Sequence, residues 1–311
     1  MDQSASVFGE RGSALYISFK PNLTATPVSF PDSGADICFL VAQSFITSDK
    51  QVTAPVHYNL RVVECSIAAC VLAKIFGLKR ELPKDNAPLG VSLRGFHDAY
   101  FEEKEGVKDN TSVDSKTFEE QLGKLLLLVD DYLHQEDGYT REQICDLLGV
   151  SVDALQQQFE SKFQVRADKF KLRQRAQHVF SEALRVSRFK ELLANPLDLS
   201  GDQLAKDLGG LMNETQDSCR DWYECSCPEL DDICKIARAA GAYGSRLTGA
   251  GWGGCSVHLV PKAKVDAVKK ALTEKYYKKK DIREEALKEA LVVSEPGAGS
   301  FVFKVTGENV V

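Results

Sequence analysis

The sequence has no run of about 18 apolar residues, which is the length a helix needs to cross a membrane. Its first residues, MDQSASVFGERGSALY, lack the basic and apolar regions of a signal peptide. Acids outnumber bases by 45 to 39, and the net charge of −6 argues against a general electrostatic grip on nucleic acid or anionic membrane. We therefore expect a cytoplasmic protein that binds neither nucleic acid nor membrane.

The sequence also lacks the usual signs of a disulfide framework or a metal site. Its nine cysteines are odd in number and mostly lie in apolar runs, which predicts reduced thiols. Cys219, Cys225, Cys227 and Cys234 are spaced C-x5-C-x-C-x6-C, whereas structural zinc usually uses paired C-x2-4-C units. No Ser-His-Asp, H-E-x-x-H or Walker A pattern occurs. We therefore predict no metal ligands in this chain.

What is present is an ordinary globular composition, with 43 % hydrophobic and 27 % charged residues in 311. Hydrophobic periodicity predicts strands at 13–19, 27–30, 37–42, 255–260, 291–294 and 301–305. It predicts helices at 59–76, 116–134, 140–148, 151–159, 169–193, 204–216, 228–241 and 265–276. The prolines and charges of 78–115 are typical of an irregular linker. The fold class expected from this order is α+β.

The densest local signal is GSRLTGAGWGGC at 244–255, with five glycines in eleven residues directly before a strand. Glycine allows positive φ and close backbone approach, so consecutive N–H groups can converge on an anion. A glycine-rich turn with only a packing role explains the same composition. Both interpretations stay open on the glycines alone.

Two further positions carry weaker signals. Asp2 is an acid at a chain terminus, where side chains are usually solvated. Tyr58 lies where a loop becomes a helix, a common place for a ligand contact. Asn59 is the expected N-cap of that helix, and Arg61 and Glu64 are spaced for a structural ion pair.

Taken together, these segments resemble the galactokinases of the GHMP sugar and metabolite kinase superfamily. GSRLTGAGWGGC resembles the family's third signature motif, and MDQSAS resembles its G-G-x-M-D-Q-x-x-S segment. APVHYNLRVVEC resembles the family's sugar-side Tyr and the helix after it. MNETQDSCRDWYECSCPELDDIC is similar to the C-terminal half of eukaryotic galactokinases and N-acetylgalactosamine kinases, and the tail ALVVSEPGAGSFVFKV looks most like the fungal branch.

The resemblance implies a GHMP kinase fold in two parts. Residues 1–55 are expected to be the C-terminal remnant of the N-terminal GHMP domain. Residues 56–311 are expected to form its helical, ferredoxin-like α+β C-terminal domain. The family's first motif and its G-L-S-S-S-A-type phosphate loop are absent from the sequence. The chain therefore looks like the C-terminal portion of a kinase. We expect Asp2 to be disordered, the strands of 13–46 to expose unpaired edges, and the chain alone to be poorly stable and inactive.

The resemblance also implies roles for individual residues. Asp2 would act as the catalytic base at the sugar C1 hydroxyl or polarise that group, and Tyr58 would contact the sugar. Four residues of the glycine-rich segment would lie near the phosphates, where backbone donors balance charge in the transition state: Ser245, Thr248, Gly249 and Gly251. ATP and Mg²⁺ are the implied cofactors, with no metal ligand assigned in this chain.

The implied activity is galactokinase, the transfer of phosphate from ATP to the C1 hydroxyl of galactose. Three alternatives stay open on the sequence. One is N-acetylgalactosamine kinase, and another is a non-catalytic sensor that binds galactose and ATP and sequesters a transcriptional repressor. The third is a fragment without function.

Overall fold

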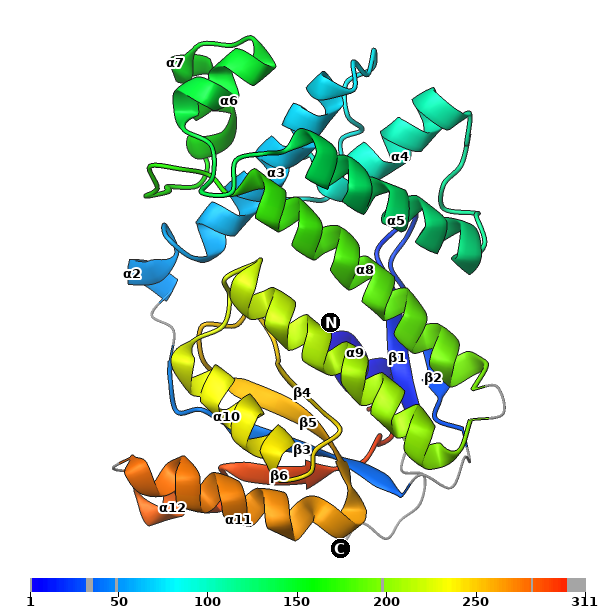
Figure 1. Ribbon diagram of the computed structural model, residues 1–311, viewed down its shortest axis with the longest axis vertical. Coiled ribbons are helices and arrows are strands. Elements are labelled where there is room, and N and C mark those ends of the chain that lie inside the picture. The colour runs from blue at the N-terminus through cyan, green and yellow to red at the C-terminus, as the bar shows by residue number, and fades with distance from the viewer. Residues whose placement is uncertain (1, 32–35, 48–49, 197–198, 281, 301–311) are drawn as a thin grey trace, which may run out of the picture.

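The computed structural model describes residues 2–31, 36–47, 50–196, 199–280 and 282–300. Its helices are α1 (Asp2–Phe8), α2 (Lys50–Thr53), α3 (Tyr58–Ile75), α4 (Leu93–Glu105), α5 (Ser115–Tyr132), α6 (Arg141–Leu148), α7 (Val152–Leu155), α8 (Leu172–Ala194), α9 (Gly201–Asp221), α10 (Pro228–Ala239), α11 (Val265–Lys275) and α12 (Glu284–Lys288). Its strands are β1 (Ser13–Ser18), β2 (Thr24–Ser29), β3 (Ile37–Gln43), β4 (Gly244–Leu247), β5 (Cys255–Pro261) and β6 (Leu291–Ser294). Figure 1 shows a helical unit above a sheet with helical cover.

The sheet of the lower unit has four antiparallel strands in the order β4-β5-β3-β6. Cys38, Leu40 and Ala42 on β3 are fully buried against a layer formed by α10, α11 and the chain after α11. The opposite face, with Phe39, packs against α9 and the end of α8. Alternation along β3 therefore sends one set of side chains to each layer.

Two glycines bring α9 directly against the sheet. A Cβ on Gly209 would lie 2.4 Å from the Tyr243 carbonyl carbon, and one on Gly244 would lie 2.5 Å from the Gly209 Cα. Such backbone contact leaves no space for a side chain. It fixes α9 over β4, the strand that leads into the glycine-rich segment.

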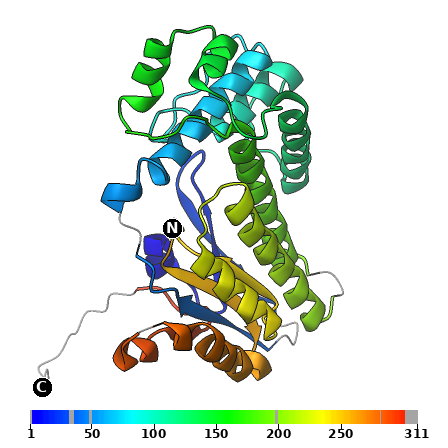
Figure 2. The same cartoon turned by 60° about the vertical axis from the view of Figure 1, so that its left-hand side comes forward.

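The helical unit is built around α3, whose Val63, Ile67 and Leu72 are completely buried among α4, α5 and α8. Helix α8 is long enough to belong to both units. Figure 2 shows its first half beside the helical unit and its second half over the sheet unit. The two units are therefore joined by a continuous helix as well as by loops.

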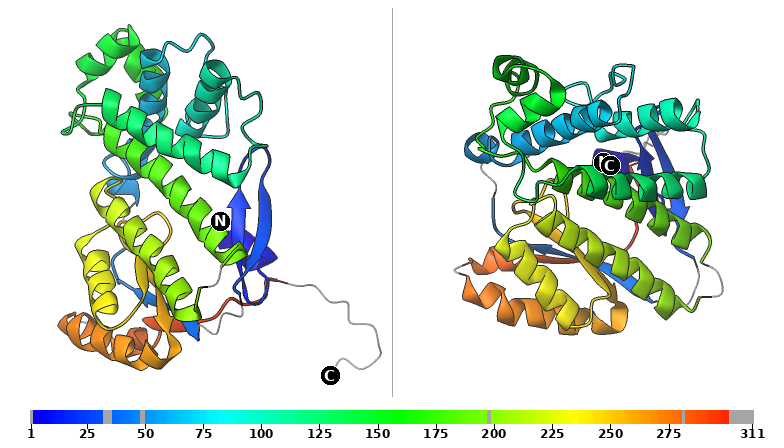
Figure 3. Two further views of the ribbon diagram at one scale, coloured as in Figure 1. Left: turned by 45° about the vertical axis from the view of Figure 1, so that its right-hand side comes forward. Right: turned by 45° about the horizontal axis from the view of Figure 1, so that its top comes forward.

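The hairpin β1–β2 pairs with no other strand in the described parts of the chain, so the expected unpaired edges are found for these two strands. The same expectation is wrong for β3, which pairs with β5 on one side and with β6 on the other. It lies beside α8 (Figure 3). The expected disorder at the N-terminus is not found for the backbone, which forms α1. Gly299 N–H donates to the Gly9 carbonyl at 2.6 Å and so ties the end of α1 to residues after β6.

A cavity of about 530 Å³ lies between β1, α8, α9 and the sheet, and most of its lining is apolar. Its charged side chains include Glu182 and Arg246, which pair with each other at 3.1 Å. None of the predicted site residues whose side chains the structure describes lines this cavity.

Most of the predicted elements are confirmed, with bounds shifted by a few residues. The predicted linker at 78–115 is wrong in part, because it contains α4, whose N-cap Ser92 accepts from Gly95 N–H at 3.0 Å. Strand β4 was not predicted, because its four residues lie inside the glycine-rich segment. The predicted strand at 301–305 lies outside the described residues.

The predicted boundary at residue 55 separates β3 from the sheet it pairs with. Phe39 is opposite Leu259 on β5 and Ser294 on β6, so β3 is an inner strand of the C-terminal sheet. We propose instead that the division falls between β2 and β3.

Candidate active site

The glycine-rich segment forms the loop from β4 to β5, and backbone hydrogen bonds hold it on both sides. Trp252 N–H donates to the Cys225 carbonyl at 2.7 Å, and Gly254 N–H donates to the Ile46 carbonyl at 2.9 Å. Thr248 N–H donates to the Cys255 carbonyl at 3.0 Å and closes the loop at its base. The loop is therefore fixed against chain segments that are remote in sequence.

Two glycines of the loop are required by close approach. Gly251 has φ +85°, and a Cβ there would lie 2.0 Å from the Cys225 carbonyl oxygen. Gly253 has φ +138°, and its Cβ would lie 2.4 Å from the Ile46 carbonyl oxygen. The packing interpretation of the motif is thus correct for these two positions. Gly249, at φ +70°, faces open space, so packing does not explain it.

The tip of the loop presents backbone donors that the fold does not use. The N–H groups of Gly249, Ala250 and Gly251 have no acceptor among the described residues. Gly249 and Ala250 are exposed, as is Thr248 before them. Adjacent free N–H groups at a turn of positive φ can receive the oxygens of an anion such as a phosphate.

Ser245 lies on β4, before the loop, and its hydroxyl is buried. Its Oγ is 2.8 Å from His258 Nδ1, and its N–H donates to Asn213 Oδ1 at 3.0 Å. Burial lowers the pKa of His258 to about 3, so this ring is neutral and acts as a structural partner. The pleat of β4 points the Ser245 side chain into the interior, so its hydroxyl does not face solvent. The predicted place of Ser245 near the phosphates stays a prediction.

Tyr58 is the first residue of α3, and its side chain is 52 % exposed. The preceding residue, His57, is the N-cap and stacks on Trp252 with ring centroids 4.8 Å apart and planes within 7°. Asn59 is not the N-cap, because α3 already begins at Tyr58. Its side-chain amide instead donates to the Gln164 carbonyl at 3.1 Å. The start of α3 thus lies against the glycine-rich loop.

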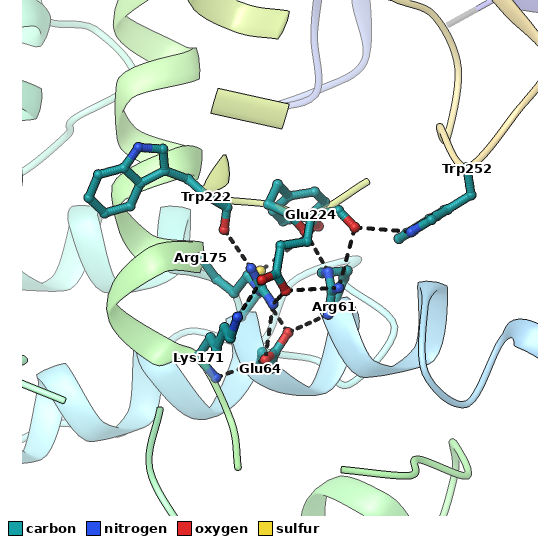
Figure 4. A network of polar contacts seen from close by, with 9 residues as sticks. Arg61, Glu64, Lys171, Arg175, Trp222, Glu224 and Trp252 are labelled. Atoms are coloured by element: carbon teal, nitrogen blue, oxygen red, sulfur yellow. Dashed lines mark hydrogen bonds and ion pairs between the residues drawn. The ribbon is translucent and has the colours of Figure 1, made fainter. Parts of the chain in front are cut away.

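A buried network of charges lies beneath this junction (Figure 4). Glu64 on α3 is its centre, with Arg61 Nη1 at 2.8 Å and Arg175 Nε at 2.7 Å from its Oε2. Lys171 N–H donates to the other carboxylate oxygen at 2.8 Å. The predicted Arg61–Glu64 pair is confirmed. Arg175 on α8 was missed, because nothing in the sequence relates two residues 111 positions apart.

Glu224 extends this network to the loop. Its carboxylate lies 2.8 Å from Arg175 Nη2 and also pairs with Lys171 Nζ. Burial alone would raise the pKa of Glu224, but hydrogen bonds from Lys171 and Arg175 outweigh burial and lower it. The carbonyl of Glu224 accepts from Trp252 Nε1 at 3.0 Å. The network therefore joins α3, α8 and the glycine-rich loop.

Asp2 is the first residue of α1, but its side chain lies outside the described residues. Its role therefore stays a prediction.

The four cysteines considered for zinc are free thiols, and the described parts of the chain hold no group of three possible metal ligands. Burial raises the pKa of the Cys65 thiol, which donates to the Tyr223 hydroxyl, to about 12. No described helix is long and apolar enough to span a bilayer.

Comparison with known proteins defines the class of protein first. Residues 197–278 match the family described as GHMP kinases C terminal. The fold agrees with the crystal structure of Lactococcus lactis galactokinase complexed with galactose, at a TM-score of 0.52 and 20 % identity over 94 % of this chain and 53 % of that one. The chain thus has the fold of the GHMP kinases, as predicted.

Sequence similarity then gives the particular relatives. The chain is 41 % identical to galactokinase of Saccharomyces cerevisiae and 39 % identical to that of Schizosaccharomyces pombe, over 98 % of its own length in both cases. The resemblance to the galactokinases that the motifs indicated is therefore confirmed along nearly the whole chain. The chain spans 59 % and 60 % of the length of these two relatives.

Proposed function

We propose that this chain serves in ATP-dependent phosphorylation of galactose at its C1 hydroxyl. The observation that carries the proposal is the identity of about two fifths, over 98 % of the chain, with a curated galactokinase. The open N–H groups of Gly249, Ala250 and Gly251 support it, because they suit the oxygens of a phosphate. The exposed Tyr58 ring supports a sugar contact near the same loop.

The proposed roles follow from the chemistry of phosphoryl transfer, which depends on positioning and charge balance. Asp2 accepts or polarises the proton of the C1 hydroxyl, and Tyr58 packs against the sugar. Backbone donors at Gly249 and Gly251 take part of the charge that develops on the transferred phosphate, with Thr248 beside them. Mg²⁺ supplies charge neutralisation between the phosphates when bound. No side chain of this chain is assigned to it.

We also propose that the protein works in a reducing compartment such as the cytoplasm, because all nine cysteines are free. Four of them are buried with relative exposures of 4 % or less: Cys38, Cys219, Cys225 and Cys234.

Coupled ADP release with D-galactose and Mg·ATP tests the function. Two polypeptides are compared. One is the 311-residue chain. The other, the fusion chain, carries at its N-terminus the segment of the S. cerevisiae relative that holds the two motifs absent here. We expect ADP release from the fusion chain only, and its loss in Asp2→Ala.

The alternatives predict other results. Turnover with N-acetylgalactosamine in place of galactose would identify the other sugar kinase. A fusion chain that binds both galactose and ATP but releases no ADP would support the sensor that binds a repressor. A fusion chain that binds neither ligand would contradict the proposal.

A further inference from the structure

Trp252 contacts residues outside its own loop, and the proposed function assigns it no role. Its main-chain N–H donates to the Cys225 carbonyl at 2.7 Å, and its indole Nε1 donates to the Glu224 carbonyl at 3.0 Å. Its ring stacks on His57, and the Arg61 guanidinium carbon lies 5.9 Å from the ring centroid. One side chain thus contacts the 222–225 turn and the start of α3.

The backbone of Trp252 is held in an unfavourable conformation. Its φ is +54°, which is rare for a bulky residue and persists only where surrounding contacts enforce it. Gly251 and Gly253 on either side allow the loop to approach Cys225 and Ile46. The loop therefore presents the indole inward at a cost, and the hydrogen bond and ring stack offset that cost.

The His57–Trp252 stack lies next to the proposed sugar contact, because His57 is joined to Tyr58 by one peptide bond. His57 is the N-cap of α3 and directly precedes Tyr58, so a contact that holds His57 also restrains the first residue of α3. Its Nδ1 is buried and has no hydrogen-bond partner among the described residues. Packing against Trp252, rather than a polar contact of Nδ1, therefore holds this ring.

We propose that Trp252 is a positioning residue that couples the phosphate-binding loop to the sugar-binding start of α3. The coupling rests on the proposed function, since that function assigns the two subsites. Trp252 touches neither ligand in this account. Trp252 fixes the position of the open N–H groups of 249–251 relative to Tyr58. A ligand bound at either the phosphate or the sugar subsite therefore restricts the motion of the other subsite.

Amide hydrogen exchange of the ligand-free 311-residue chain tests the physical link without any ligand. Trp252→Phe keeps a ring but removes the N–H donor. One hydrogen bond of this kind is worth about a threefold to tenfold change in an opening equilibrium. We expect exchange to rise by about that factor both at the protected amides of 252–255 and in 57–62. Trp222→Phe is the matched control, because the Trp222 ring stacks with Arg173 and makes no described contact with the loop.

A second pair of variants tests the stack itself. His57→Phe keeps an aromatic ring beside Trp252 and is expected to leave exchange in the loop near the wild-type rate. His57→Ala is expected to raise it. The proposal would be overturned if Trp252→Phe left exchange in 57–62 at the wild-type rate, or if His57→Ala left exchange at the protected amides of 252–255 at the wild-type rate.

The functional consequence is measured on the fusion chain by titration calorimetry. The dissociation constant of D-galactose is determined with and without saturating Mg·ADP. We expect the ratio of the two constants to move toward one in Trp252→Phe by at least about threefold relative to Trp222→Phe. An unchanged ratio would overturn the coupling. If the fusion chain binds neither ligand, the proposed function fails, and the exchange experiment still decides whether Trp252 links the two segments.

Discussion

Two neighbouring polar regions use their hydrogen-bonding groups in opposite ways. In the buried network, both carboxylate oxygens of Glu64 receive donors from Arg61, Arg175 or Lys171. At the tip of the adjoining loop, the N–H groups of 249–251 receive no acceptor among the described residues. A buried polar group whose hydrogen bonds are all made within the protein stabilises the folded chain. A free donor on a loop held this firmly is available to a ligand.

The largest effect is expected from breaking the satisfied region. Arg175 is 1 % exposed, and Arg175→Met leaves Glu64 and Glu224 with fewer cations in a buried setting. Removing one partner of a buried pair costs about 3–5 kcal/mol, which urea denaturation would measure as lost free energy of unfolding.

The matched control is a surface pair. Arg80 pairs with Glu102 at 2.8 Å, but its side chain is 80 % exposed. Arg80→Met is expected to cost less than about 1 kcal/mol. Equal losses in the two variants would contradict the view that the network holds the fold.

The second prediction compares two glycines of the loop. Gly249→Ala meets open space and carries only the cost of positive φ, about 1–2 kcal/mol. Gly251→Ala adds a contact of 2.0 Å with the Cys225 carbonyl, and overpacking of this kind costs about 1–3 kcal/mol more. Thermal unfolding of both variants measures the difference. A Gly251→Ala chain as stable as Gly249→Ala would show that Cys225 does not support the loop.

The third prediction concerns buried histidines. His97 is buried and binds Gln121 at 2.8 Å, and burial lowers its pKa to about 4 from an ordinary value of 6.5. The unfolded chain therefore takes up the proton first, so stability is full above pH 6.5 and falls as the pH drops from about 6.5 to 4. Each such group contributes up to about 1.4 kcal/mol per pH unit.

His97→Gln is expected to make the free energy of unfolding depend less steeply on pH, by the contribution of one histidine, because it removes the group that takes up the proton. Urea denaturation between pH 7 and pH 5 measures the slope, with His134→Gln at an exposed position as control. The same slope in His97→Gln and the wild type would rule out this account of His97.

The comparison also shows what the sequence could predict. Local chemistry was sufficient for α6, whose capping box joins Thr140 and Gln143, and for α10, which begins at Pro228. For the glycine-rich segment, local chemistry left two interpretations open, and the structure assigns the packing role to Gly251 and Gly253, while the phosphate role of the loop tip stays a prediction. Helix α4 was missed because Pro83, Pro88 and the charges of 78–115 indicated a linker, although Ser92 caps the helix in the structure.

The support of the site could not be predicted, because it depends on residues that meet only in the folded chain. Arg61 and Glu64 are one turn apart on α3, whereas Arg175 and Glu224 come from α8 and a turn after α9. Nothing in the sequence indicated that the Trp252 ring stacks on His57. The burial of the Ser245 hydroxyl could not be predicted either, because a motif identifies neighbours along the chain and does not show which side of a strand faces the interior.

Amide exchange of the fusion chain with and without Mg·ADP tests whether the open N–H groups bind phosphate, with nucleotide binding verified by calorimetry in the same buffer. We expect nucleotide to slow exchange at Gly249, Ala250 and Gly251, because the phosphates supply their missing acceptors, and to leave exchange in 222–225 unchanged. Bound nucleotide with no added protection at 249–251 would contradict this expectation.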